Sequence, residues 1–237
     1  MKKYIPNTIT CANLFCGAVA TDAALAGNTG HAALLIFIAA ILDFFDGMVA
    51  RLLGVSSPMG KELDSLADVI SFGMVPASVA FITMQAALHN TTVEPTTLML
   101  VLKYFPFLIA VFSGLRLAKF NIDTRQSDRF IGVPTPANAL FVVSFILTSG
   151  GGIIPQSYFS NPYFIAIICL LCSLWLVMEV PLLALKFKSF ALKGNELRYA
   201  LIALSLFLFI LLQVKALPFI VILYVLLSLL ENILSKK

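Results

Sequence analysis

The chain has 237 residues, of which 60% are hydrophobic and only 12% are charged, and its mean hydropathy is +0.98. Soluble domains carry roughly 25% charged residues, so this composition excludes an ordinary water-soluble protein. The net charge of +4 is less informative than the positions of the positive residues. We expect membrane lipids around the chain and no nucleic-acid partner.

Eight apolar runs approach the ~20 residues that a helix needs to cross a bilayer. They cover residues 8–26, 31–51, 66–88, 97–116, 136–154, 162–185, 197–214 and 216–234. The first run carries Asn and Thr residues that we assign to a functional site, so we interpret it as part of the protein and not as a removable signal peptide. The sequence therefore predicts an all-α, polytopic membrane protein.

The positive residues indicate how these helices are oriented. With eight spans both termini lie on one side, and every Lys and Arg except Lys103 and Lys215 falls on that side. Cytoplasmic loops are enriched in Lys and Arg. We therefore expect both termini and the loops at 51–66, 116–136 and 186–197 to face the cytoplasm, in the cell membrane.

The four cysteines do not have the pattern of a disulfide framework. Cys11 and Cys16 lie in the first apolar run, and Cys169 and Cys172 form a C-x-x-C inside the sixth. We interpret all four as small packing residues, with a redox or metal site as the alternative.

The most informative stretch runs from Asp43 to Asp68. Near the end of the second span, four residues share an arc of about 100° on a helix: Asp43, Asp46, Gly47 and Ala50. At the start of the third span, Asp64 and Asp68 share a stripe with Gly60 before them. The segment 54–58 predicts a turn, so two carboxylates from each of two antiparallel helices converge at the cytoplasmic boundary.

Four carboxylates at this place are unfavourable without a function. Each costs at least ~2.5 kcal/mol toward the bilayer interior, and the four repel one another. Divalent cations offset both effects, and hard oxygen ligands suit Mg²⁺, Mn²⁺ or Ca²⁺. The alternative of a surface turn with solvated acids predicts no particular spacing. An ion or proton transporter is a rival of another class, because intramembrane acids also mark ion pathways.

This stretch resembles a known family. The pattern D-x2-D-G-x2-A-R-x8-G-x3-D-x3-D is the signature of the CDP-alcohol phosphotransferases, and it is matched at Asp43, Asp46, Gly47, Ala50, Arg51, Gly60, Asp64 and Asp68. The resemblance implies a six-helix membrane core, usually a homodimer, with a metal site open to the cytoplasm. We therefore expect a core domain at residues 1–190 and a pair of additional transmembrane helices at 191–237.

The resemblance also implies roles for the signature residues. Two divalent cations, Mg²⁺ or Mn²⁺, would be held by Asp43, Asp46, Asp64 and Asp68. Asp68 would also be the general base. Gly47, Ala50 and Gly60, with Arg51, would form the pocket for the nucleotide of CDP-diacylglycerol.

The sequence shows no activated nucleophile, which favours direct displacement over a covalent intermediate. The only histidines, His31 and His89, fall in loops on the opposite side, and no serine or cysteine with an adjacent histidine is apparent. Two cations can clamp the phosphoryl oxygens and orient the attack. A positioned carboxylate can take the proton of the acceptor alcohol.

Two other features are candidates for substrate binding. A polar stripe on the first span recurs within roughly 120° of helix: Asn7, Thr10, Asn13 and Gly17. We interpret Asn7, Thr10 and Asn13 as facing a wet cavity, with helix–helix packing as the alternative. Glu179, an acid inside the sixth apolar run, is a weaker candidate that otherwise pairs structurally.

The segment after the fourth span narrows the acceptor. It reads R-L-A-K-F-N and then G-V-P-T-P-A. Together with the polar stripe, it resembles the bacterial and archaeal phosphatidylserine synthase branch of the family, although Lys119 replaces an arginine. The resemblance implies transfer of the phosphatidyl group to L-serine, with Arg116, Lys119 and Asn121 as binding residues. Glycerol 3-phosphate and inositol phosphates stay open as alternative acceptors.

Overall fold

The structure is a computed structural model that describes residues 4–90, 97–123, 130–148, 154–183 and 195–234. The first half contains α1 (Tyr4–Leu25), α2 (Thr29–Leu52), α3 (Pro58–Asp68), the π-helical turn η1 (Val69–Met74), α4 (Val75–His89), α5 (Thr97–Leu102), the 3₁₀ turn η2 (Phe105–Phe107) and α6 (Leu108–Ile122). The second half contains β1 (Phe130–Ile131), α7 (Thr135–Leu147), α8 (Gln156–Phe159), α9 (Pro162–Val177), β2 (Pro181–Leu182), α10 (Glu196–Leu212), the 3₁₀ turn η4 (Gln213–Ala216) and α11 (Leu217–Leu234).

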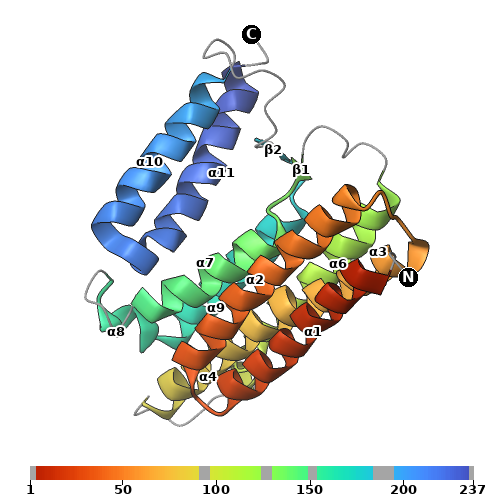
Figure 1. Cartoon of the computed structure of the whole chain (residues 1–237). Coiled ribbons are helices and arrows are strands. Elements are labelled where there is room, and N and C mark those ends of the chain that lie inside the picture. The colour runs from red at the N-terminus through yellow and green to blue at the C-terminus, as the bar shows by residue number, and fades with distance from the viewer. Residues whose placement is uncertain (1–3, 91–96, 124–129, 149–153, 184–194, 235–237) are drawn as a thin grey trace.

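The long helices form one bundle with a hairpin beside it. Helices α1, α2, α4, α6, α7 and α9 pack side by side, and α10 and α11 form the hairpin next to α7 (Figure 1). Helix α1 begins, α2 ends and α11 ends at the end of the molecule that also holds β1 and β2 (Figure 1). We call this the site end, because the four aspartates of the signature lie there.

Among the described residues, five helical stretches are long and apolar enough to cross a membrane. They are Tyr4–Leu25, Thr29–Leu52, Pro58–His89, Thr97–Ile122 and Glu196–Leu234. The last stretch is the α10–α11 hairpin, which turns at Gln213 (φ 52°). The apolar helices α7 and α9 are shorter. The prediction of an all-α, polytopic membrane protein is confirmed, with one short antiparallel pairing of β1 with β2 that the sequence did not indicate.

Small side chains let the helices of the bundle approach closely. One buried cluster joins α1, α2, η1 and α4 through residues such as Ala20, Ala32 and Phe72. Another joins α4, α6, α7 and α9, and it contains Cys169 and Cys172, which are free thiols. Close packing through Ala, Ser and Gly is typical of membrane helices. The interpretation of these two cysteines as packing residues is therefore confirmed.

The predicted sixth span, 162–185, is longer than the helix that the structure has there. Helix α9 ends at Val177, Met178 is extended, and Pro181 begins β2. Proline lacks an N–H and disfavours helical backbone at the residue before it, so the helix cannot run through this position. Glu179 consequently lies in a connection at the site end, not inside a helix.

The connection before α7 packs tightly against the end of α9. Gly132 has φ +75°, and a Cβ on it would lie 2.4 Å from Leu176 O. The N–H of Val133 donates to Trp175 O at 3.1 Å. Only glycine fits this left-handed, crowded position. The close approach fixes where α7 starts, immediately beside the aspartates.

Candidate active site

A short turn joins the two helices that carry the four aspartates. Helix α2 supplies the first two and α3 the last two. Between them Gly54 adopts φ +62°, which glycine enters without strain. The Oγ of Ser57 caps α3 by accepting from the N–H of Gly60 at 3.0 Å, and Pro58 fits the first turn because no N–H is needed there. The turn predicted at 54–58 is therefore present.

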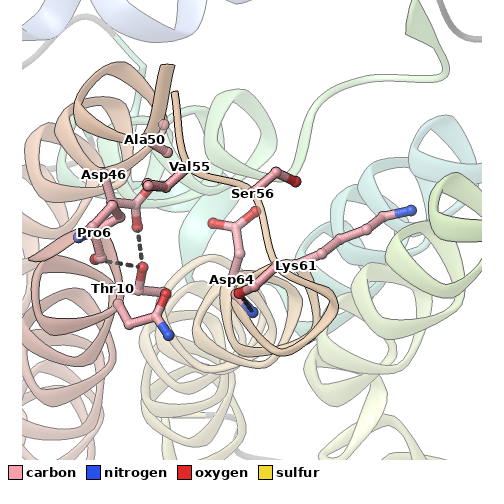
Figure 2. Close-up of a pocket in the computed structure, with 12 residues that line it drawn as sticks. Pro6, Thr10, Asp46, Ala50, Val55, Ser56, Lys61 and Asp64 are labelled. Carbon is pink, nitrogen blue, oxygen red and sulfur yellow. Dashed lines mark hydrogen bonds between the residues drawn. The ribbon is translucent and has the colours of Figure 1, made fainter. Parts of the chain in front are cut away.

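This turn and α1 enclose a pocket of about 240 Å³ (Figure 2). It is lined by Pro6, Asn7, Thr10, Asp46, Gly47, Ala50, Val55, Ser56, Ser57, Gly60, Lys61 and Asp64. The lining includes the three small residues predicted to contact the nucleotide and the first two members of the polar stripe. A Cβ on Gly47 would meet nothing within 4 Å, whereas one on Gly60 would lie 3.0 Å from Ser57 Oγ and 3.1 Å from Asn7 Oδ1. Gly47 thus leaves the pocket wide, and Gly60 lets α3 approach α1.

Hydrogen bonds hold both walls of the pocket. Thr10 Oγ1 donates to Asp46 Oδ2 at 2.6 Å, which links α1 to α2 (Figure 2). On the other wall, Lys61 Nζ donates to Asn121 O at 2.9 Å, and Asn121 Nδ2 donates to Ser65 Oγ at 2.9 Å. Asn121, which the sequence predicts to bind the acceptor, therefore ties α6 to α3 in this structure.

Three of the four aspartates meet behind the pocket. Asp43, Asp64 and Asp68 each offer a carboxylate oxygen, and these oxygens lie within 4.8 Å of one another. Asp43 and Asp68 are close enough to share a hydrogen bond. Asp46 is on the pocket side, within electrostatic range of Asp43 and Asp64. Asp64 belongs to both the cluster and the pocket lining, so it joins the two.

The cluster fits a hard divalent cation. Asp68 is only 7% exposed, and its Oδ1 has no hydrogen-bond partner among the described residues. Within the described ranges, none of the four aspartates forms a salt bridge with Lys or Arg. Repelling carboxylates that leave a buried oxygen unpaired are unfavourable alone, whereas carboxylate oxygens are the ligands that Mg²⁺ and Ca²⁺ prefer.

Asp68 lies at a break in the helical geometry. Helix α3 ends there and continues as the π-helical turn η1, a feature that is frequent at functional sites and that the sequence does not signal. In η1, Ser71 Oγ donates to Asn13 O at 3.1 Å, and a Cβ on Gly17 would lie 2.3 Å from Ser71 Oγ. The deeper half of the polar stripe therefore packs against η1.

Asn13 is outside the pocket lining. It is completely buried, and both polar atoms of its side chain lack a hydrogen-bond partner in the described part of the chain. The backbone oxygen of Asn13 contacts η1, as the helix–helix packing alternative predicts. A substrate role for its amide stays a prediction.

Arg116 approaches the cluster from α6. It is 7% exposed and lies within electrostatic range of Asp68 and of Tyr224 on α11. Thr135 Oγ1, at the start of α7, donates to Asp68 Oδ2 at 3.3 Å. Sequence reasoning did not identify Thr135 or Tyr224 as site residues. Thr135 belongs to the G-V-P-T-P-A run, but nothing in that run distinguishes it from its neighbours. Tyr224 lies in the last apolar run, which contains no motif.

Two other predicted binding residues have different neighbours. Lys119 forms a salt bridge with Glu179, which gives that acid a partner that the sequence did not suggest. Arg51 is exposed, and its Nε donates to Gly47 O at 3.0 Å, one turn back on α2. Neither Lys119 nor Arg51 lines the pocket. Their predicted contacts with substrate would need the substrate to extend beyond it.

Comparison with known proteins agrees with this geometry. The family profile of the CDP-alcohol phosphatidyltransferases matches residues 3–210. The chain is 40% identical over 144 residues to CDP-diacylglycerol–serine O-phosphatidyltransferase of Bacillus subtilis, covering 60% of this chain and 76% of that protein. It is 36% identical over 144 residues to the enzyme of that name from Helicobacter pylori, covering 60% of this chain and 56% of the relative.

A third relative extends the similarity. The protein of the same name from Mycobacterium leprae is 34% identical over 190 residues, covering 76% of this chain and 58% of the relative. The chain thus spans little more than half the length of the Helicobacter and Mycobacterium relatives. Because the profile covers most of the chain, including all four aspartates, the chain belongs to the CDP-alcohol phosphatidyltransferase family.

Proposed function

We propose that the protein transfers the phosphatidyl group of CDP-diacylglycerol to L-serine and forms phosphatidylserine and CMP. The observation that carries this proposal is the carboxylate cluster Asp43–Asp64–Asp68 at the inner end of a pocket lined by the signature glycines. The names of the relatives support serine as the acceptor. Membership of a phosphatidyltransferase family favours this reaction over ion transport.

The pocket between α1, α2 and α3 suits the nucleotide half of the donor. Gly47 leaves one wall bare, so a cytidine ring can approach the backbone of α2. Asp46 and Asp64 lie where this pocket meets the cluster. The pyrophosphate of the donor would then extend from the pocket toward Asp68.

The acceptor would enter from the side of Arg116. A planar guanidinium can hold a carboxylate through two parallel N–H bonds, and serine carries a carboxylate next to its hydroxyl. Arg116 is buried within electrostatic range of Asp68, so a serine held by Arg116 would have its hydroxyl on the side of Asp68. Thr135 donates to Oδ2 of Asp68, and Asp68 would serve both as a cation ligand and as the base that takes the hydroxyl proton.

The reaction is then a single displacement. The serine oxygen forms a bond to the phosphorus that carries diacylglycerol, the bond from that phosphorus to CMP breaks, and Asp68 takes the hydroxyl proton. Asp43, Asp64 and Asp68 would hold divalent cations, Mg²⁺ or Mn²⁺, with Asp46 completing the site. Two bound cations would neutralise the phosphoryl oxygens and the departing CMP.

We further propose that the site end faces the cytoplasm. The cationic residues Lys61, Arg116, Lys119 and Arg198 come from the helix ends that meet there, and this matches the enrichment of Lys and Arg in cytoplasmic loops. The homodimer implied by the family resemblance stays a prediction.

The test uses purified protein with CDP-diacylglycerol and Mn²⁺. Serine, glycerol 3-phosphate, inositol and inositol 1-phosphate are supplied separately, and CMP and the new lipid are measured. Serine should give at least tenfold faster CMP release than the others. If glycerol 3-phosphate is faster, serine is the wrong acceptor for this family member. If no alcohol releases CMP, the enzymatic proposal fails.

Arg116→Lys separates the acceptor from the donor. Lysine keeps the charge but loses the planar fork, so the KM for serine should rise several-fold more than the KM for CDP-diacylglycerol. Lys119→Arg is the matched control, because Lys119 pairs with Glu179, whereas Arg116 lies within electrostatic range of Asp68. Equal changes in both KM values would assign Arg116 to the donor phosphates.

A further inference from the structure

Beside the C-terminal hairpin lies an open apolar cavity that the proposed chemistry does not use. The cavity lies between α7, α10 and α11, measures about 610 Å³, and is walled by side chains such as Leu201, Phe209 and Val221. Its lining has two polar side chains, Ser205 and Tyr224. A cavity of this size and composition suits a hydrocarbon chain.

A second apolar cavity continues the first toward the far end of the bundle. It measures about 250 Å³ and lies between α2, α7 and the tip of the hairpin, with Phe209 lining both cavities. We call the two together the hairpin groove. It extends from Leu201 on α10 to Val214 in η4, which at 1.5 Å per residue is roughly 20 Å. One leaflet of hydrocarbon is about 15 Å thick, so the groove is deep enough for an acyl chain.

The groove begins beside the catalytic groups. Pro134 lines it, and the next residue, Thr135, donates to Asp68. Tyr224 lines it too and lies within electrostatic range of Arg116. Helix α2 lies between α1 and α7 (Figure 1). Residues of α1 and α2 line the polar pocket, whereas residues of α2 and α7 line the groove. The aspartates therefore separate a polar pocket from an apolar groove.

We propose that the hairpin groove holds one acyl chain of the lipid donor, and that α10 and α11 make the enzyme selective for chain length. This inference rests on the proposed function, because a phosphatidyl donor has a polar nucleotide at one end of its phosphates and acyl chains at the other. Lipid tails are as apolar as leucine, so the chain gains little by moving from bilayer to groove. The groove acts through its shape: it fixes the chain and so fixes the position of the phosphorus.

The test compares two substitutions on α10. Ser205→Trp fills the groove, whereas Ala203→Trp adds the same side chain at an exposed position two residues away that does not line it. Both variants and the parent are assayed with dihexanoyl and dipalmitoyl CDP-diacylglycerol. Ser205→Trp should lower the ratio of kcat/KM for the dipalmitoyl donor over the dihexanoyl donor at least tenfold. Ala203→Trp should leave this ratio within twofold of the parent, and the same ratio in all three proteins would overturn the proposal.

A second measurement does not depend on turnover. A CDP-diacylglycerol with a diazirine near the end of one acyl chain is photolysed with the protein, and labelled peptides are identified by mass spectrometry. Label should appear within 201–221, should be removed by excess unlabelled donor but not by phosphatidylcholine, and should fall in Ser205→Trp only. Labelling confined to other helices would overturn the groove as the acyl site.

These outcomes separate the two proposals. If the parent releases no CMP with any alcohol yet labels in the groove, the acceptor chemistry fails while the lipid site stands. If Ser205→Trp instead changes the oligomeric state and leaves the chain-length ratio unchanged, a second copy of the chain occupies the groove and the acyl-chain proposal is wrong.

Discussion

Two regions of the chain, Pro58–His89 and Glu196–Leu234, are built on opposite principles. In Pro58–His89, 61% of the most apolar window is buried inside the molecule, whereas in the hairpin stretch Glu196–Leu234 only 17% is buried. The first region is held by close backbone contacts, such as Gly17 against Ser71. The hairpin is held to the bundle mainly through α11 against α7 and by hydrogen bonds to the segment around β2.

This difference teaches where the sequence can be informative. Catalytic carboxylates must keep fixed spacing on helices that approach one another closely, so the motif and the small residues around it are constrained together. A wall against lipid requires only apolar side chains of suitable size. We therefore expect substitutions in the first region to stop the reaction, and substitutions in the hairpin to change stability or donor choice.

The largest effect should come from removing the metal. With excess EDTA, CMP release should fall to the rate without enzyme, because Asp43, Asp64 and Asp68 then have no cation to offset their repulsion. Mg²⁺ or Mn²⁺ should restore it. The measurement is serine-dependent CMP release before and after dialysis, and full turnover in EDTA would contradict the metal site.

Asp68→Asn should lower kcat by about 10²–10⁴-fold, the usual range for loss of a general base. The amide keeps the size of the side chain but cannot take the proton of the acceptor. Binding of CDP-diacylglycerol, measured by calorimetry, should persist. Asp22→Asn, an exposed aspartate on α1, is the control and should behave like the parent. A rate within threefold of the parent would exclude Asp68 as the base.

These site residues show how much was readable from the sequence. The signature predicted the two carboxylate helices and their turn, because each of these features is local and periodic. It did not predict that Asp46 lies on the pocket side, paired with Thr10, since that depends on the rotation of α1 against α2. The π-helical turn after Asp68 and the partner of Glu179 were also unreadable, because both arise from packing between distant segments.

The same limit explains the errors at the second half of the chain. Residues 178–183 are mostly apolar, like the helix before them, so the sequence predicted a single span through this segment. Pro181 disfavours a helix there, and α9 ends at Val177. Tyr224 had no motif around it, and only the packing of α11 against α7 brings it near Arg116. The predicted boundary at residue 190 stays a prediction, because residues 184–194 lie outside the described ranges.

Two glycines that line the pocket should separate affinity from stability. Gly47→Ala meets no atom within 4 Å, so the helix should gain up to ~1 kcal/mol while the methyl group narrows the pocket. Binding of CDP should weaken several-fold, which corresponds to roughly 1 kcal/mol. Gly60→Ala would crowd Ser57 Oγ and Asn7 Oδ1 and should cost about 1 kcal/mol of stability.

Calorimetry with CDP and Mn²⁺ gives the affinities of these two variants, and thermal unfolding in detergent gives the stabilities. The expected signs are opposite for stability. A Gly47→Ala protein that binds CDP as well as the parent would show that the nucleotide does not lie against this part of α2.

The smallest effect should come from the attachment of the hairpin. Ser228 is fully buried on α11, and its Oγ accepts from the N–H of Leu183 at 3.0 Å while donating to Tyr224 O at 2.7 Å. Ser228→Ala leaves that buried N–H without a partner. Hydrogen bonds between membrane helices average only ≈ 0.6 kcal/mol, because alternative partners exist in the unfolded state. The melting temperature should therefore fall by about 1–3 °C, given roughly 2–4 °C per kcal/mol for a chain of this size. The control Ser160→Ala, at an exposed position, should leave the melting temperature unchanged.

Turnover of the dihexanoyl donor by Ser228→Ala should stay within twofold of the parent, because the aspartates, Arg116 and Thr135 belong to the bundle and not to the hairpin. If Ser228→Ala instead abolishes turnover of this short donor, the hairpin holds the catalytic groups in place and the contrast between the two regions is wrong.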